Sequence, residues 1–309
     1  MIAAHADWSL DARKRWVSIA RRQGQGWQAS APRLVGDPAI LSASLIAAGA
    51  PAALGLDLPL GVPRCFAAKR TEQAFPAFLA GLAGNREFFT VSPTLDTVSP
   101  ARPFYPARGI KGMTRAAHAA ALGFADASGL SRLCDRATVE RPAGAPVFWT
   151  LGANQSGKAA ISAWRDWLAP ALAAGAPFKL WPFDGVLHDL LRPGQLVLAE
   201  VYPAEALRQL GLKLVGSKRA EAPRRGLAPA LRDAMAALRV TPDAALAGMI
   251  QGGFGTDAAG EDRFDSLIGL LGLIGVMDGK RPDFIPEDPM IRAWEGWVLG
   301  QTALPLNQG

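Results

Sequence analysis

The strongest constraint on the fold is the order of elements in the first sixty residues. Three short apolar segments separated by turns are predicted to form a β-meander of strands: 2–8, 14–22 and 27–35. The next pair, Asp37-Pro38, is typical of a helix start, because Asp caps the first turn and proline is tolerated within it. A further strand is expected over 53–58. A meander, a helix and another strand predict a mixed sheet in which the later strand is parallel to one of the first three.

The remainder of the chain is predicted to be mainly helical, with one late strand at 195–201 and a proline-rich loop at 92–111. The predicted helices cover 66–82, 114–135, 158–174, a short segment that starts at Pro203, 224–238 and 261–277. These elements predict one α/β domain over 1–309, with a mixed sheet flanked by helices. A mostly helical and loop insertion is expected at about 64–193.

The composition fits a folded core and excludes several classes of protein. Hydrophobic residues make up 50% of the 309 residues and charged residues 19%, which is too apolar for a disordered chain. Two cysteines and three histidines exclude a disulfide framework and argue against a His/Cys metal cluster. A net charge of +6 permits an acidic partner such as nucleic acid. Neither an export signal nor a membrane span is recognised, so a cytoplasmic location is expected.

Acidic side chains occur where carboxylate chemistry is expected: Asp7, Asp57, Glu200, Asp262 and Asp265. The first three lie near the ends of predicted strands, where sites gather in open α/β sheets. The other two are three residues apart, on one face of the last predicted helix. An acid among apolar neighbours is costly to bury unless it is paired or binds a metal. Carboxylates that converge are stabilised by a hard divalent cation such as Mg²⁺ or Mn²⁺.

Each of these acids also has a structural interpretation. Asp7 is followed by turn residues and could serve the turn. Glu200 could cap the helix that follows it, and Asp262 suits a first helical turn through the helix dipole alone. The apolar context of Asp57 favours a functional role. Asp265 is preferred to Asp262 because it precedes the apolar face of the helix.

Four motifs in order resemble the family called domain of unknown function 429. The family's first-strand Asp is matched by Asp7, and its Asp-(Ile/Leu)-Pro-(Ile/Leu)-Gly-(Leu/Val)-Pro by 57–63. Its Glu-Val-(His/Tyr)-Pro is matched by 200–203. Its last-helix Asp-x-x-Asp-Ala is matched by 262–266, with serine in place of alanine.

This resemblance spans 2–279, is weakest over 64–193, and implies an RNase H-like fold with predicted nuclease activity. The implied ligands for one or two Mg²⁺ or Mn²⁺ ions are Asp7, Asp57 and Asp265, with Asp262 or Glu200 as a further ligand. The ions would support hydrolysis of phosphodiester bonds. Relatives commonly have glycine after the first Asp, whereas this chain has Trp8, which is expected to narrow the site.

A glycine-rich loop suggests a second site. The segment from Gly152 to Lys158, with Gly157 before the lysine, fits the first part of a phosphate-binding loop, with a strand expected at 147–151. The next residue is Ala159, so the hydroxyl that would bind Mg²⁺ beside a nucleotide is absent. The segment could hold one phosphate of a substrate, or be a plain strand-turn-helix junction.

The basic and aromatic residues do not decide whether the protein binds nucleic acid. The stretch 205–239 holds eight basic and three acidic residues, and is either a surface for a phosphate backbone or a solvated helical face. Trp164 and Trp167 share a helix face, which favours a core position over base stacking. Three hypotheses therefore stand. The first is a metal-dependent nuclease, the second a non-catalytic nucleic-acid or protein-binding module, and the third an enzyme that uses the Gly152–Lys158 loop for a phosphate ligand.

Overall fold

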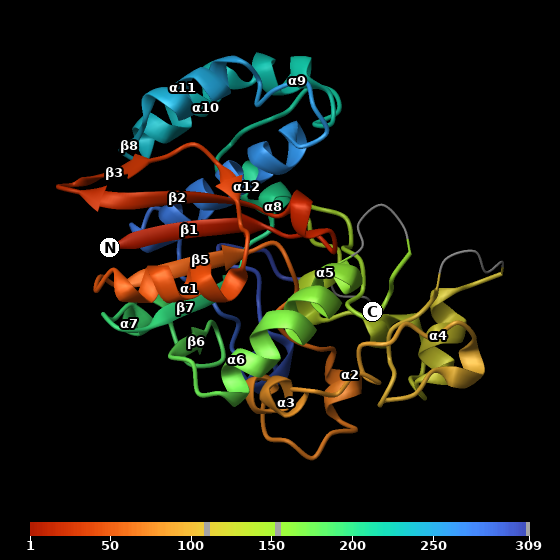
Figure 1. Ribbon diagram of the computed structural model, residues 1–309. Helices are drawn as coiled ribbons and strands as arrows, with labels where there is room; N and C mark the ends of the chain where they lie inside the picture. Colours follow the sequence, from red (N-terminus) through yellow and green to blue (C-terminus); the bar gives the residue numbers. More distant parts are fainter. Residues whose placement is uncertain (108–111, 152–155, 307–309) are drawn as a thin grey trace.

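The described residues, 1–107, 112–151 and 156–306 of the computed structural model, build a mixed eight-stranded sheet (Figure 1). The strand order across the sheet is β6-β7-β5-β1-β2-β3-β8, and the short β4 pairs with β2. The strands are β1 (Ile2–Asp7), β2 (Trp16–Gln23), β3 (Gly26–Ala29), β4 (Arg33–Leu34), β5 (Ala52–Leu56), β6 (Phe178–Leu180), β7 (Leu196–Glu200) and β8 (Val240–Pro242). Helices cover both faces, so the predicted α/β class with a mixed, helix-flanked sheet is confirmed.

The N-terminal elements follow the predicted order, with one break. β1, β2 and β3 form the antiparallel meander, and β5 pairs in parallel with β1. Between them, α1 (Pro38–Ala47) begins as expected, because the Asp37 carboxylate accepts a hydrogen bond from the Ala39 N–H at 2.7 Å. The predicted extent of the third strand, 27–35, is wrong. Pro32 has no N–H for the ladder, so the chain leaves β3 and returns to pair with β2 as β4.

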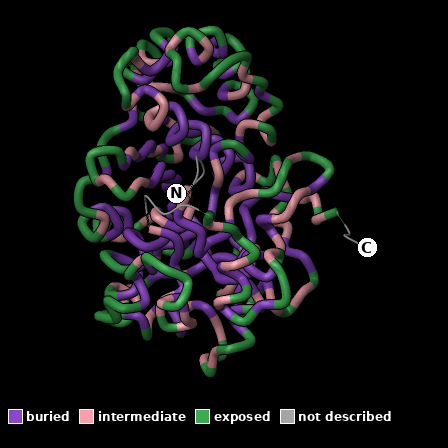
Figure 2. The backbone as a smooth tube through the Cα atoms, turned by 90° about the vertical axis from the view of Figure 1, so that its right-hand side faces the viewer, coloured by how far each residue is buried: buried purple, intermediate pink, exposed green. Residues whose placement is uncertain are grey.

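The two faces of the sheet carry different sets of helices. In Figure 1, α1 lies in front of the sheet and α12 behind it. The front set, which shares one hydrophobic core, includes α2 (Arg64–Ala67), α3 (Phe75–Gly81), α4 (Arg115–Ala121), α5 (Ser156–Ala163) and α6 (Ala169–Ala173). The back set, which shares the other core, includes α7 (Leu187–Leu190), α8 (Pro203–Gln209), α10 (Ala228–Ala237), α11 (Ala244–Gln251) and α12 (Gly260–Met277). The short α9 (Glu221–Gly226) precedes α10 directly. Figure 2 shows buried backbone through the interior and exposed backbone around it.

The helix α12 packs closely on β1 because glycines make room for His5. A Cβ atom at Gly269 would lie 2.2 Å from the His5 ring, and one at Gly55 would lie 2.9 Å from it. The ring nitrogens of His5 lie 3.2 Å from the Ser266 carbonyl oxygen and 3.1 Å from that of Val201. Burial lowers the pKa of His5 to about 4, so the ring is neutral. This contact fixes the start of α12 over the end of β1.

The predicted insertion at 64–193 is less helical than expected and includes part of the sheet. The predicted helix 66–82 is two short helices, because Pro76 fits only in the first turn of α3. The predicted helix 114–135 ends at Ala121, and short 3₁₀ turns follow. Strand β6 lies within this segment and pairs in the sheet. It is not predicted from the sequence, because three residues are too few to show an alternation of apolar and polar side chains. No helix in the described ranges is long and apolar enough to cross a membrane.

Candidate functional site

Asp7 and Asp57 lie side by side at the same edge of the sheet. The parallel register of β1 and β5 pairs Ala6 with Leu56, and the Asp57 N–H donates to the Ala6 carbonyl at 3.1 Å. Side chains alternate along a strand, so both acids share the face of His5, toward α12. The prediction that these two acids end neighbouring parallel strands is confirmed.

The helix α12 brings Asp265 to the same place. Asp7 and Asp265 are only 8% and 6% exposed, whereas Asp57 and Asp262 are partly exposed and open the cluster to solvent. We call Asp7, Asp57, Asp262 and Asp265 the acidic cluster. Its members come from β1, from the residue after β5 and from the first turns of α12. The structure therefore brings together four of the five acids predicted from sequence.

Burial and mutual repulsion disfavour the ionised forms of these acids. Burial raises the pKa of Asp7 well above its usual range, and the charges of Asp57 and Asp265 raise it further. Burial, followed by the charge of Asp265, raises the pKa of Asp57 to about 7. Burial also raises the pKa of Asp265 to about 6, against the opposing effect of Lys218. Lys218 and the neighbouring Asp7 carboxyl offset part of the rise in the pKa of Asp57.

Lys218 forms an ion pair with Asp265 of this cluster, and sequence reasoning missed its role. Its ammonium group forms ion pairs with Asp265 and, at 3.4 Å, with Glu261. The side chain remains 43% exposed. In sequence it is one of eight basic residues in a stretch, and no local pattern singles it out. Its place depends on a loop folding back onto α12.

Glu200 lies on the opposite face of the sheet from Asp57. It pairs with Leu56 in the register of β7 and β5, so the alternation of side chains points it away from α12. The carboxylate accepts hydrogen bonds from the Leu60 N–H at 2.7 Å and from both terminal nitrogens of Arg132, each at 2.7 Å. Glu200 raises the pKa of Asp57 only as a minor cause. It neither joins the acidic cluster nor caps α8, so both sequence interpretations of Glu200 are wrong.

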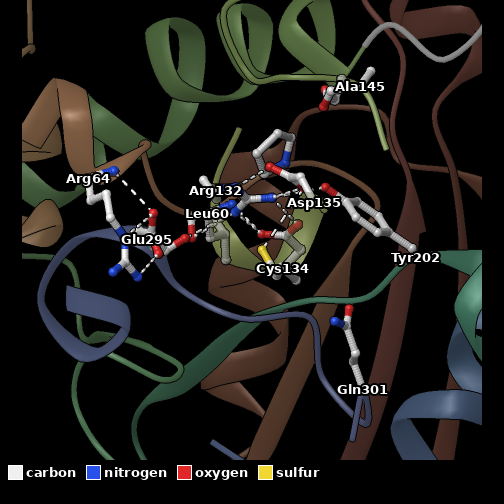
Figure 3. Close-up of polar contacts among 12 residues, drawn as sticks. Leu60, Arg64, Arg132, Cys134, Asp135, Ala145, Tyr202, Glu295 and Gln301 are labelled. Carbon is white, nitrogen blue, oxygen red and sulfur yellow. Dashed lines mark hydrogen bonds and ion pairs between the residues drawn. The ribbon is translucent and has the colours of Figure 1, made fainter. Parts of the chain in front are cut away.

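Arg132 occupies the centre of a second, buried polar cluster (Figure 3). Its guanidinium donates two hydrogen bonds to Asp135, both at 2.9 Å, besides those to Glu200. In the described chain, one set of three acidic, thiol or imidazole groups has donor atoms within 4.8 Å of one another: Cys134, Asp135 and Glu200. The buried cation already neutralises these two carboxylates and would repel a metal ion. We conclude that this set is structural.

Most of the glycine-lysine loop, residues 152–155, lies outside the described residues, so the predicted phosphate site stays a prediction. Gly152 lies outside the described residues, and Lys158 lies in α5. A Cβ atom at Gly157 would lie 2.5 Å from the Val147 carbonyl oxygen, so packing alone explains this glycine. The expected strand at 147–151 is wrong, because only an isolated bridge forms there, between Trp149 and a distant tyrosine.

The tryptophans near the site belong to the core. Trp8 follows Asp7 and therefore points to the opposite face, where it stacks on Trp167 at 5.5 Å between ring centres. The expectation that Trp8 narrows the acidic site is therefore wrong. Trp164 and Trp167 are both buried, which confirms their predicted core position. The Trp164 indole N–H also donates to the Pro59 carbonyl at 3.0 Å, which supports the loop after Asp57.

Comparisons of the chain with family models, curated proteins and solved structures find no match. The functional inference therefore rests on the acidic cluster itself. Its strongest features are the register that aligns Asp7 with Asp57 and the burial of Asp265 against them. Carboxylates, one lysine and a partly exposed opening permit cation binding and acid-base chemistry.

Proposed function

We propose that this chain is a metal-dependent nuclease with an RNase H-like sheet, in which Asp7, Asp57 and Asp265 bind Mg²⁺ or Mn²⁺. The observation that carries the proposal is the convergence of three carboxylates, from segments far apart in sequence, at one buried position. In the strand order β3-β2-β1-β5-β7, the pairs among β3, β2 and β1 are antiparallel and those among β1, β5 and β7 are parallel. This order supports the RNase H-like assignment.

The acidic cluster fits a divalent cation in its chemistry. Carboxylate oxygens are the ligands that Mg²⁺ prefers, and these carboxyl groups are unstable as anions without a counter-charge. Their oxygens are spread more widely than the donor atoms of the Arg132 cluster, which all lie within 4.8 Å of one another, so a single ion would require side-chain rotation. Two ions, typically about 4 Å apart, would span a wider set of ligands.

The surroundings of the cluster suit a phosphate ester. When bound, the metal would lower the pKa of water and stabilise charge on the leaving oxygen. Lys14 lies close enough to lower the pKa of Asp262, and Arg219 is 78% exposed beside Glu261. These cations would attract a phosphate backbone. Arg224, from the same basic stretch, is buried and serves the fold instead.

The test combines metal binding with nuclease assays. Wild-type protein should show a melting temperature that rises with Mn²⁺ or Mg²⁺, and should cleave DNA or RNA at low salt. Asp57→Asn should lose cleavage by several orders of magnitude and lose the metal-dependent rise, while remaining folded. The matched control is Asp233→Asn, an exposed acid of α10, which should behave as wild type.

The outcomes separate the hypotheses. The nuclease hypothesis is contradicted if two results occur together. The first is no cleavage of single- or double-stranded DNA or RNA, and the second is no rise in melting temperature with metal. If the protein nevertheless binds nucleic acid, the hypothesis of a non-catalytic binding module replaces the nuclease hypothesis. Loss of activity in Asp57→Asn only in proportion to a lower melting temperature would make Asp57 a structural acid.

A further inference from the structure

We propose that Lys218 is the resident counter-ion of the acidic cluster and competes with the divalent cation for Asp265. This inference rests on the proposed function. Lys218 is the basic side chain in direct ion-pair contact with a proposed ligand, Asp265, and it also pairs with Glu261 one turn away on α12. A divalent ion that takes Asp265 as a ligand must displace this contact.

The loop that carries Lys218 is fixed in place by a buried arginine. Arg224 is 1% exposed and donates a hydrogen bond to the Lys218 carbonyl oxygen. The same guanidinium donates to the carbonyls of Gly253 at 2.9 Å and Gly255 at 2.6 Å, just before α12. A Cβ atom at Gly260 would lie 2.3 Å from this guanidinium and 2.6 Å from the Gly255 carbonyl oxygen, a backbone atom that cannot move aside easily, so glycine fits best there. Lys218 is therefore a built part of the cluster.

The electrostatic argument has two parts. The Lys218 ammonium lies in ion-pair contact with Asp265 and, at 3.4 Å, with Glu261, so it offsets negative charge in the cluster when no metal is bound. An ammonium cannot replace a divalent ion, because it carries half the charge and a flexible stem. Removing it would leave the cluster more negative and free Asp265, so the metal should bind more tightly.

The first measurement is Mn²⁺ affinity by titration calorimetry at pH 8. Lys218→Met should bind Mn²⁺ about ten-fold more tightly than wild type or better, since one unit charge is removed next to the ligands. Lys218→Arg keeps the competing charge and should stay within a few-fold of wild type. Lys213→Met removes an exposed lysine of the same stretch and should leave the affinity unchanged.

The second measurement is the melting temperature of each variant at pH 8 in EDTA, which removes divalent metal and so tests the role of Lys218 alone. Lys218→Met should melt several degrees below wild type, and Lys218→Arg should recover most of that loss. Added Mn²⁺ should reverse the order, with the larger rise for Lys218→Met.

Three results would overturn the inference. They are unchanged or weaker Mn²⁺ binding by Lys218→Met, an unaltered melting temperature of this variant in EDTA, and an equal effect of Lys213→Met. Failure of the proposed function has a different signature. In that case no variant binds Mn²⁺, while the loss of stability in EDTA still reports whether Lys218 is the counter-ion.

Discussion

Asp57 illustrates how one residue can be unfavourable for the fold and still have a place in the proposed metal site. It follows directly after a fully buried strand, and the parallel register places it beside Asp7. Both carboxyl groups face α12, where Asp265 adds a third. Burial and neighbouring charge both favour the protonated form, so the folded protein holds a proton here that the unfolded chain would release at neutral pH.

We expect Asp57→Asn to stabilise the metal-free protein at alkaline pH. Because the pKa of Asp57 is raised to about 7, its stabilising proton is fully present below about pH 4 and is lost as the pH rises through 7. Asn cannot ionise, so the variant avoids this loss. In EDTA, urea unfolding should show a gain on the order of 1–3 kcal/mol at pH 8.5 that shrinks toward pH 4.

Asp233→Asn again provides the control, because this acid lies exposed on α10, away from the acidic cluster. A variant of Asp57 that is less stable than wild type at pH 8.5 would show that the charged carboxylate is well accommodated without metal. That result would remove the electrostatic support for a cation site.

At the scale of elements, the contact of α12 with β1 determines where Asp265 lies. The His5 side chain projects from β1 against Gly269, one turn beyond Asp265. Hence the glycine is needed for close approach of helix and sheet, although glycine weakens a helix in general. The same helix contains Gly275, where a Cβ atom would meet Leu238 at 3.9 Å, an ordinary van der Waals contact.

These two glycines form a matched pair for mutation. Gly269→Ala should destabilise the protein by about 1–3 kcal/mol or more, because its Cβ atom overlaps the His5 ring. Gly275→Ala should be neutral or stabilise by up to about 1 kcal/mol, because alanine is the better helix former. Free energies of unfolding in urea test both. Equal effects would mean that α12 does not rely on the His5 contact.

The sequence predicts elements better than contacts between them. Apolar segments, turn residues and the Asp37 cap predict the meander, α1 and β5, and strand ends predict the pairing of Asp7 with Asp57. Glu200 also ends a strand, but the register with β5 decides its face, and register is not visible in one sequence. Lys218 and Arg132 meet their acidic partners 47 and 68 residues away, so no local spacing reveals them.

At the scale of the whole molecule, the Arg132 cluster joins three distant parts of the chain. Arg132 lies in the predicted insertion, Glu200 ends β7, and the Glu295 carbonyl oxygen accepts a further contact from Arg132 at 3.3 Å. Arg64 in α2 pairs with the Glu295 carboxylate at 2.7 Å. Through Leu60, the network also holds the loop that begins at Asp57.

Arg132→Met should cost about 3–5 kcal/mol of unfolding free energy, because it leaves two buried carboxylates without their cation. The comparison is Arg165→Met. Arg165 pairs with Asp166 at the surface, where both side chains are more than 40% exposed, so the cost should be below about 1 kcal/mol. Urea unfolding measures both, and a similar small loss for the two variants would show that the Arg132 cluster adds little to stability.

The distance along the chain between β1 and α12 also affects when the acidic cluster can exist. His5 and Ser266, which touch in the folded protein, are 261 residues apart. During synthesis β1 and β5 can pair early, since β2, β3, β4 and α1 between them are all short, but α12 is made much later. Until then Asp7 and Asp57 have neither Asp265 nor Lys218 beside them. The growing chain would therefore carry no complete acidic cluster, and the proposed hydrolytic activity would begin only once the back of the sheet is covered.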